Sequence, residues 1–210
     1  MIQMKSVICG MSRVSLALLA ACALAGGASA ATTTVQNMQA AYNGESNAHS
    51  RYLAFAKQAD TEGYGEVASL FRAAARAEEI HAGNHAAVIK ELGAVPQANI
   101  ESPTVKTTRD NLEAAIKGET YERDTMYPDF LKQARTDRNK SAVKSLNFAK
   151  TAEAEHAKLY AAALADLDHL KGTQSKALFV CPVCGFTTRE LNFTKCPSCF
   201  TPKEKYEQVA

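Results

Sequence analysis

Two short motifs in this sequence pair a glutamate with a histidine three residues later. Glu78-x-x-His81 and Glu153-x-x-His156 each lie in an alanine-rich stretch with helical character. Residues i and i+3 share one face of a helix, so each motif can present a carboxylate and an imidazole to a single point. With lone glutamates from two further helices, two such pairs would form a set of ligands for two metal ions.

The further carboxylates follow glycines in two other predicted helices. Glu45 follows Gly44, Glu119 follows Gly118, and Glu122 adds another carboxylate one helical turn later. Five glutamates that converge in an apolar interior would repel one another, and each uncompensated buried charge costs several kcal/mol. Two iron ions would largely cancel this charge. Oxygen-rich sites with one imidazole per ion suit iron or manganese better than zinc.

Several polar residues lie close to these motifs in the sequence. Tyr52 and Tyr127 follow the glycine-glutamate pairs of their helices by two turns, so each hydroxyl could orient a carboxylate. The alternative is that both are core aromatic residues. We interpret His49 and His85 as polar residues beside the site or at the surface.

Helical periodicity covers four long segments, over residues 34–61, 66–92, 108–136 and 141–170. Gly63 interrupts the pattern after the first segment, and Gly93 and Pro96 end the second. Residues 94–107 have no period and form a connection that is long for a helical bundle.

The two halves of the chain repeat one another. Phe55-x-Lys57-Gln58-Ala59 matches Phe130-x-Lys132-Gln133-Ala134, and at the same offset Tyr52 corresponds to Tyr127, Glu78 to Glu153 and His81 to His156. The chain therefore reads as a duplicated helical hairpin joined by the long connection. This pattern predicts an all-α, ferritin-like four-helix bundle with one crossover over residues 31–171.

Two Cys-Pro-x-Cys motifs follow the bundle, with Cys181 and Cys184 in the first and Cys196 and Cys199 in the second. The spacing lets four thiolates close a tetrahedral site, where zinc would only stabilise the tail and iron would also carry an electron. Two disulfides are the structural alternative in an exported protein. Residues 177–210 are too few to bury a core unaided, so we predict a small domain that binds a metal ion through its four cysteines.

The first thirty residues have the composition of an export signal. Lys5 and Arg13 precede an apolar run from Val14 to Ala25, and Ala28-Ser29-Ala30 follows it as a small-residue cleavage site. The run is too short to span a bilayer comfortably, so we predict a signal peptide over residues 1–30, a periplasmic protein and no stable transmembrane anchor. Lipidation at Cys22, within a lipobox-like Leu-Ala-Ala-Cys, is the alternative.

The overall charge argues against one class of partner. The chain has 24 Lys and Arg against 22 Asp and Glu, a net charge of +2. Removal of the predicted signal peptide brings the net charge to about zero. Nucleic acid is therefore not expected as a partner.

Together these features resemble the rubrerythrin family, in which a ferritin-like di-iron bundle precedes a rubredoxin-like domain. The resemblance covers nearly all of the chain after the signal segment. Its markers are Gly44-Glu45-Ser46, Glu78-x-x-His81, Gly118-Glu119-x-x-Glu122, Met126-Tyr127-Pro128, Glu153-x-x-His156 and the two cysteine motifs. It implies iron ligands at Glu45, Glu78, His81, Glu119, Glu122, Glu153 and His156, and a further iron on Cys181, Cys184, Cys196 and Cys199. It also implies that Glu122 exchanges with His81 as one iron changes its redox state.

The resemblance further implies a peroxidase that reduces hydrogen peroxide to water in oxidative-stress defence, with electrons from the rubredoxin-like iron. We count Tyr52 and Tyr127 with the seven ligands as expected catalytic residues. Relatives are commonly dimers in which the tail of one subunit approaches the di-iron site of the other, so we expect a homodimer. One alternative is a ferroxidase or iron-sequestering protein with a structural zinc tail. Another is a structural or metal-sensing protein with an idle bundle.

Two features depart from the family pattern. Phe200 follows the last cysteine, where a small residue is usual, and a bulky side chain fits a positive-φ turn poorly. The signal segment would also separate the protein from nicotinamide-dependent electron supply. We therefore hypothesise another donor, such as a cytochrome or a membrane-linked carrier.

Overall fold

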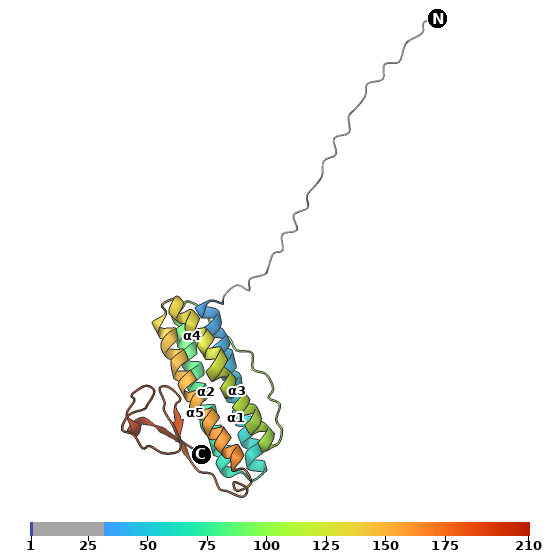
Figure 1. Ribbon diagram of the computed structural model, residues 1–210, viewed down its shortest axis with the longest axis vertical. Coiled ribbons are helices and arrows are strands. Elements are labelled where there is room, and N and C mark those ends of the chain that lie inside the picture. The colour runs from blue at the N-terminus through green and yellow to red at the C-terminus, as the bar shows by residue number, and fades with distance from the viewer. Residues whose placement is uncertain (2–31) are drawn as a thin grey trace. The chain divides into compact units, whose positions relative to one another are not determined.

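Four long helical segments form the bundle that the periodicity predicts. The computed structural model describes Met1 and residues 32–210, so the predicted signal peptide and Cys22 lie outside the described residues. The helices are α1 (Thr34–Thr61), α2 (Gly65–Glu91), α3 (Thr108–Tyr121), α4 (Tyr127–Thr136) and α5 (Lys140–Ala165) (Figure 1). A π-helical turn, η1 (Glu122–Met126), joins α3 to α4 without a break, so these three segments form the third helix of the bundle.

Local sequence signals set where the helices begin. The Thr33 hydroxyl accepts a hydrogen bond from the backbone N–H of Gln36, whose side chain accepts one from the backbone N–H of Thr33 in return. Thr107 caps α3, and the Asn139 side chain caps α5 by accepting from the Ala142 N–H. Each cap satisfies a backbone N–H that the first helical turn leaves without a partner.

The fourth predicted helix is too long at its C-terminal end. We expected it to reach residue 170, but α5 ends at Ala165 and residues 166–172 form turns. Leu167 is nonetheless buried and Leu170 packs against the same core. The apolar spacing therefore continues past the end of the helix because these turns also cover the bundle.

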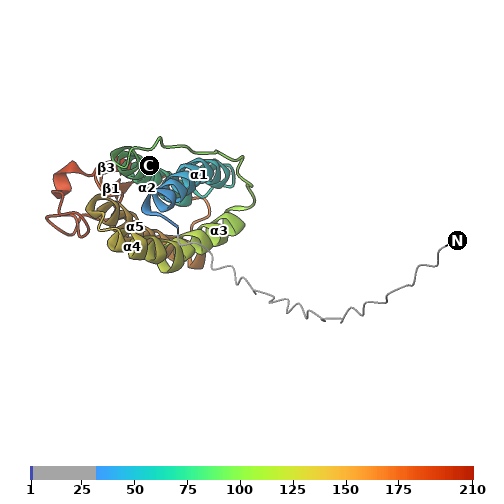
Figure 2. The ribbon, with the colours of Figure 1, turned by 90° about the horizontal axis from the view of Figure 1, so that it is seen from above.

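The connection from α2 to α3 crosses the outside of α1, as Figures 1 and 2 show. Side chains of α1 hold its backbone: Asn43 Oδ1 accepts from the Asn99 N–H at 2.7 Å, and Asn47 Oδ1 accepts from the Glu101 N–H at 2.8 Å. Since the connection spans the length of the bundle, α2 and α3 run in the same direction. The crossover is therefore confirmed.

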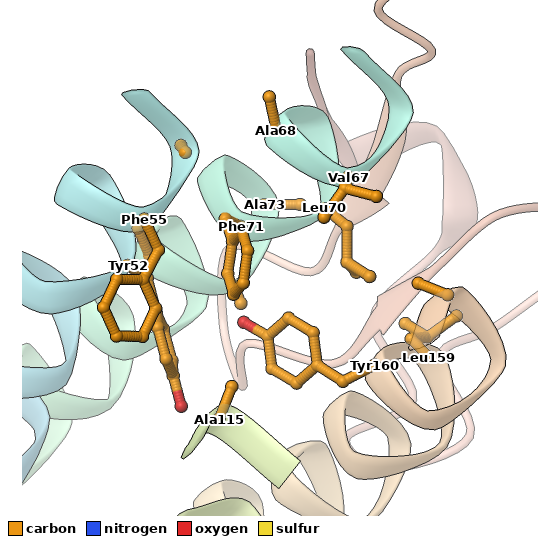
Figure 3. Packing of buried hydrophobic residues seen from close by; sticks show 14 of the residues in the cluster. Tyr52, Phe55, Val67, Ala68, Leu70, Phe71, Ala73, Ala115, Leu159 and Tyr160 are labelled. Carbon is orange, nitrogen blue, oxygen red and sulfur yellow. The ribbon is translucent and has the colours of Figure 1, made fainter. Parts of the chain in front are cut away.

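An aromatic cluster fills one end of the bundle (Figure 3). The rings of Tyr52, Phe55, Phe71 and Tyr160 are all buried, with centroids 5.2 Å apart for Phe71 and Tyr160 and 5.6 Å apart for Tyr52 and Tyr160. Such separations are typical of favourable aromatic pairs. The cluster packs directly beside the polar residues of the bundle interior.

The cysteine-containing tail forms a small antiparallel sheet with the order β2-β1-β3. The strands are β1 (Leu178–Val180), β2 (Thr187–Thr188) and β3 (Glu207–Val209), and a 3-10 turn, η2 (Lys203–Lys205), precedes β3. Leu178 and Val180 are buried in the same core cluster as residues of α2. Arg76 of α2 also binds Glu207 through two hydrogen bonds of 2.7 and 3.0 Å. The tail therefore packs against the bundle of its own chain.

No helix within the described residues is both long enough and apolar enough to cross a membrane.

Candidate metal centres

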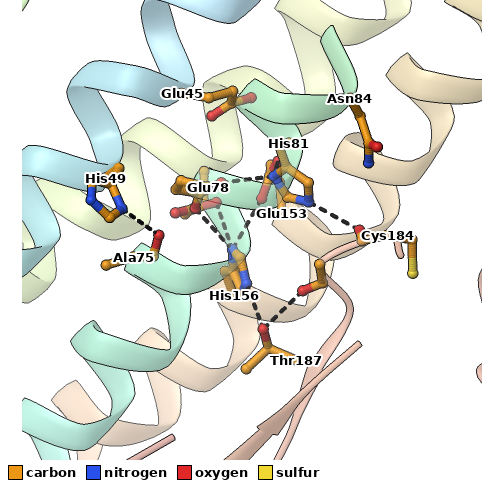
Figure 4. Close-up of polar contacts among 12 residues, drawn as sticks. Glu45, His49, Ala75, Glu78, His81, Asn84, Glu153, His156, Cys184 and Thr187 are labelled. Atoms are coloured by element: carbon orange, nitrogen blue, oxygen red, sulfur yellow. Dashed lines mark hydrogen bonds and ion pairs between the residues drawn. The ribbon is translucent and has the colours of Figure 1, made fainter. Parts of the chain in front are cut away.

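Six of the seven predicted bundle ligands converge in the buried interior, and Figure 4 labels all of them except Glu119. They form two overlapping groups whose ligand atoms lie within 4.8 Å of one another: Glu45, Glu78, His81 and Glu153 in one, and Glu78, Glu119, Glu153 and His156 in the other. Each group holds one histidine, and Glu78 and Glu153 belong to both. The arrangement would hold two metal ions, with Glu78 and Glu153 available to both.

The histidines direct their Nδ1 atoms at these carboxylates. His156 Nδ1 lies 3.0 Å from Glu153, 3.3 Å from Glu78 and 3.5 Å from Glu119. His81 Nδ1 lies 2.8 Å from Glu78 and 3.2 Å from Glu153. Nitrogen and oxygen ligand atoms therefore crowd around the same points, as a bound cation requires.

Unpartnered polar atoms show that the site fits metal ions. Within the described part of the chain, the buried atoms without a hydrogen-bond partner include Glu45 Oε2, Glu78 Oε1, Glu119 Oε2, both carboxylate oxygens of Glu153, and His156 Nδ1. A buried polar atom without a partner is costly, and native proteins rarely keep several together. Bound cations would satisfy all six.

The electrostatics of the metal-free chain point the same way. Burial, followed by the charges of Glu122 and Glu78, raises the pKa of Glu45 well above its usual range. Burial and the charge of Glu78 raise the pKa of Glu119 to about 8. Burial acts in the same sense on Glu78, but the imidazoles of His156 and His81, which lie against its carboxylate, outweigh it and hold its pKa at about 2. Protons thus stand in for part of the positive charge that metal ions would bring.

Glu122 is the one predicted ligand that belongs to neither group. It lies half-buried at the start of η1. Burial and then the charge of Glu119 raise its pKa well above the usual range, so its carboxylate lies close enough to sense the site. Its role as a ligand that exchanges with His81 stays a prediction.

The π-helical turn explains a shift in the internal repeat. Glu45 corresponds to Glu119, whereas Tyr52 corresponds to Tyr127 one residue later. A π turn accommodates one extra residue in a continuous helix, and η1 lies between Glu119 and Tyr127. Both tyrosines therefore reach equivalent places despite the unequal spacing.

Each tyrosine hydroxyl donates to a carboxylate on another helix. Tyr52 donates to Glu119 Oε1 at 2.5 Å, and Tyr127 donates to Glu45 Oε1. All four side chains are buried. A hydrogen bond of this kind fixes the orientation of a ligand carboxylate, while a catalytic role for either tyrosine stays a prediction.

His85 is more closely tied to the site than its spacing indicates. It is fully buried, its Nδ1 lies 2.8 Å from Ser145 Oγ, and its Nε2 lies 3.2 Å from the Tyr127 hydroxyl. Burial lowers the pKa of His85 to about 3, so the ring is neutral. His49 instead donates from Nδ1 to the Ala75 carbonyl at 2.8 Å. The sequence contains one indication that His85 lies near the site, because it follows His81 by one helical turn. It contains no such indication for Ser145.

The four cysteines of the tail converge as predicted. They are free thiols whose sulfur atoms lie within 4.8 Å of one another, with 3.5 Å between Cys181 and Cys199 and between Cys184 and Cys196. A tetrahedral metal site with bonds of about 2.3 Å separates its sulfurs by about 3.8 Å. Phe200 adopts a φ of 63°, so the turn after Cys199 does require the left-handed conformation.

The tail also binds both bundle histidines on the side away from the carboxylates (Figure 4). His81 Nε2 donates to the Cys184 carbonyl at 3.1 Å, and His156 Nε2 donates to Thr187 Oγ1 at 3.0 Å. Thr187 in turn donates to the Gly185 carbonyl at 2.9 Å. These bonds keep a proton on Nε2 of both imidazoles, so that Nδ1 is the nitrogen that would bind a metal ion.

Gly185 allows this close approach. Its φ is 74°, and a Cβ at this position would lie 2.3 Å from His81 Nε2. Only glycine fits beside the imidazole. Neither Gly185 nor Thr187 was identifiable from the sequence, because their role depends on how the tail docks on the bundle.

Comparisons with known proteins agree with these two centres. The rubrerythrin family profile matches residues 36–164. Nigerythrin of Nitratidesulfovibrio vulgaris is 38% identical over 175 residues, which cover 83% of this chain and 85% of that protein. Rubrerythrin-2 of Clostridium acetobutylicum is 38% identical over 176 residues, which cover 83% of this chain and 95% of that protein.

A solved structure of fully reduced, all-ferrous nigerythrin has a TM-score of 0.78 and 36% identity, with 88% of this chain and 91% of that chain covered. The fold is thus a ferritin-like bundle followed by a rubredoxin-like domain. The cofactors are a di-iron site in the bundle and an iron or zinc ion in the four-cysteine site. The chain belongs to the rubrerythrin family, whose members are di-iron oxidoreductases of oxidative-stress defence.

Proposed function

We propose that this chain is a peroxidase that reduces hydrogen peroxide to water with electrons from an iron held by the four cysteines. The hydrogen bond from His81 Nε2 to the Cys184 carbonyl carries the proposal. It places one imidazole ring between the two centres, so an electron has a short bonded path from a cysteine ligand to the bundle site. A ferroxidase that stores iron has no need of such a path.

Reduction of one peroxide consumes two electrons and two protons and yields two waters. A bound diferrous pair would supply the two electrons that break the O–O bond. The chain holds the ligands in place: Tyr52 and Tyr127 orient Glu119 and Glu45, and the tail fixes both histidines. The tail also covers the histidine side of the site, which keeps bulk water from it.

The test is a single-turnover reaction of the iron-loaded full chain, reduced without oxygen and mixed with peroxide. We expect the visible band of the thiolate-bound iron to bleach on reduction and to return with peroxide. When a reducing donor is then supplied, the cycle should repeat without net loss of ferrous iron. Stoichiometric consumption of added ferrous iron would favour the ferroxidase alternative. Metal analysis that finds zinc in the tail would show that electrons come from an external donor.

A double variant and a matched control test whether the reaction takes place at the bundle site. We expect the Glu78→Ala and Glu153→Ala double variant to lose peroxide turnover. The matched control replaces Glu79 and Glu155, the neighbours on the same two helices that belong to neither metal group. If the double variant still turned over peroxide, the bundle would have no catalytic role.

We also propose that the protein is exported to the periplasm after cleavage of residues 1–30, and that its electrons come from a carrier outside the inner membrane. Cell fractionation and the N-terminal sequence of the purified protein test this. A mature protein that begins at a lipidated Cys22 would support the anchored alternative. A cytoplasmic protein with an intact N-terminus would overturn export.

We further propose a homodimer, as the family resemblance implies. Sedimentation of the full chain is the direct test, and a monomer at micromolar concentration would overturn the proposal.

A further inference from the structure

A line of hydrogen bonds leads from Glu45 to the surface of the bundle. Tyr127 donates to Glu45, His85 Nε2 lies 3.2 Å from the Tyr127 hydroxyl, and Ser145 Oγ lies 2.8 Å from His85 Nδ1. His85 and Tyr127 are fully buried, and Ser145 is 5% exposed. Only the last member of the line therefore reaches solvent.

The donors in this line all point toward the carboxylate. Because Tyr127 gives its hydroxyl proton to Glu45, its oxygen must accept from His85 Nε2–H. A neutral imidazole with its proton on Nε2 accepts at Nδ1, so Ser145 donates to His85. Each group thus accepts from the outer neighbour and donates to the inner one.

The outer end opens into a pocket of about 220 Å³ between α2, α5 and the tail. Its lining includes Ser145, the charged residues Glu91 and Lys144, and Val183 of the tail. Asn84 holds the Val183 carbonyl at 2.9 Å, which fixes the tail at the pocket edge. Charged groups at an open pocket keep water there, so Ser145 has a source of protons.

The internal repeat supplies a comparison within the same molecule. At the offset that relates Tyr52 to Tyr127, Tyr160 corresponds to His85 and Leu70 corresponds to Ser145. In that half, Tyr160 and Leu70 belong to the buried apolar core, and the Tyr160 hydroxyl has no hydrogen-bond partner among the described residues. Each half has a tyrosine that donates to a carboxylate. Among the described residues, only Tyr127 is also linked by hydrogen bonds to a residue at the surface.

We propose that Ser145, His85 and Tyr127 form the route by which protons pass from the pocket to Glu45 at the di-iron site. The proposal rests on the peroxidase function, because that reaction consumes two protons for each peroxide. Tyr127 gives its proton to Glu45 and takes one from His85 Nε2. His85 takes one at Nδ1 from Ser145, and pocket water restores the serine hydroxyl. The imidazole ring then turns over, which brings the new N–H back to face Tyr127 before the second proton passes. Each transfer breaks one O–H or N–H bond and forms another, and the carboxylate passes the proton to a departing peroxide oxygen.

The first test follows the His85 Nε2 proton and does not depend on activity. In the full chain loaded with zinc and labelled with ¹⁵N-histidine, NMR measures how fast this proton exchanges with water. We expect Ser145→Ala to slow the exchange at least about 10-fold and Ser145→Thr, which keeps the hydroxyl, to leave it unchanged. Equal exchange in Ser145→Ala and the unaltered chain would overturn the route.

The second test uses the iron-loaded chain and peroxide. Glutamine at position 85 can still hydrogen-bond to Tyr127 and Ser145, but it does not take up a proton on one side and release one on the other. We expect His85→Gln to keep two irons in the bundle and to slow peroxide-driven oxidation about 100-fold. Tyr160→Phe, the matched change in the other half, should react at the rate of the unaltered chain.

The outcomes separate the two proposals. If the unaltered iron-loaded chain does not reduce peroxide, the proposed function fails, and the exchange measurement still decides whether the line carries protons. If it reduces peroxide and His85→Gln, with its iron in place, does so equally fast, the proton route is wrong and the function stands.

Discussion

The hydroxyl of Tyr127 on α4 donates a hydrogen bond to Glu45 on α1, across the bundle from its own helix. Tyr52 on α1 makes the reciprocal bond to Glu119 on α3. Each tyrosine therefore hydrogen-bonds to the carboxylate of the other helical hairpin and not to one in its own. This arrangement ties the two halves together at the metal site.

Loss of either hydroxyl should weaken iron binding and leave the fold intact. We expect Tyr127→Phe and Tyr52→Phe each to lower iron affinity about 10-fold, because the ligand carboxylate loses the bond that orients it. Competition with a chelator measures the affinity. Tyr160→Phe is the control, since that hydroxyl has no partner in the part of the chain that the structure describes. Equal affinities in all three variants would show that the tyrosines only fill the core.

The metal-free chain should lose stability as the pH rises from about 6.5 to 9. The pKa of Glu119 is about 8 instead of near 4.5, and that of His81 is about 10 instead of near 6.5, because nearby carboxylates favour its charged form despite burial. Both folded-state pKa values lie above the unfolded values, so the folded chain holds more protons in this range and is destabilised as they leave. The raised pKa of His156 acts in the same sense. The pKa of Cys181, which its hydrogen bond with Cys184 lowers to about 5, acts in the opposite sense over this range but offsets only one of these three groups. The lowered pKa of His85, about 3, opposes the trend only up to about pH 7.

Thermal unfolding of the chelator-treated chain measures this trend. The iron-loaded chain is the control, since metal ions replace the protons and its midpoint should change less over the same range. A metal-free midpoint that rises with pH would contradict the assignment of these charges.

Replacement of Gly185 should disturb the contact between the tail and His81. A Cβ there would overlap the imidazole, and the φ of 74° adds backbone strain. We expect Gly185→Ala to slow electron transfer between the two centres at least about 10-fold. Gly172→Ala is matched for strain, with a φ of 80°, but its Cβ would meet open space. If both variants transferred electrons equally fast, the close approach would have no functional role.

Phe200 should destabilise the tail, and a residue that tolerates its backbone conformation should be more stable at this position. Its φ of 63° is unfavourable for a side chain with a Cβ, and 73% of the residue is exposed, so little packing compensates. Asparagine tolerates this conformation well. We expect Phe200→Asn to stabilise the metal-loaded tail by about 1 kcal/mol in denaturant unfolding. A loss of stability would mean that the phenyl ring makes a contact worth more than the strain.

Because the tail contacts its own bundle, each chain should hold a complete electron path. We therefore expect no recovery of peroxide turnover when a Glu78→Ala and Glu153→Ala chain is co-refolded with a Cys184→Ser chain. Restoration to a large fraction of the unaltered rate would show that the tail serves the partner chain in a dimer. Each variant refolded alone is the control.

The sequence alone determined the features that depend on local spacing. The two Glu-x-x-His motifs, the helix starts at Thr34 and Thr108 and the paired cysteines follow from periods and caps that act within a few residues. The repeat and the long connection also determined the crossover topology. These features suffice for the bundle, for six of the seven predicted bundle ligands that converge in it and for the four-cysteine site.

Tertiary structure decided what depends on contacts between distant segments. Ser145 and Thr187 have no signal in the sequence, because they act only once α5 and the tail lie against His85 and His156. The crossed bonds of the tyrosines and the fit of Gly185 arise in the same way. Helical period places a residue on a face, but the atom that it meets there depends on how the helices and the tail pack together.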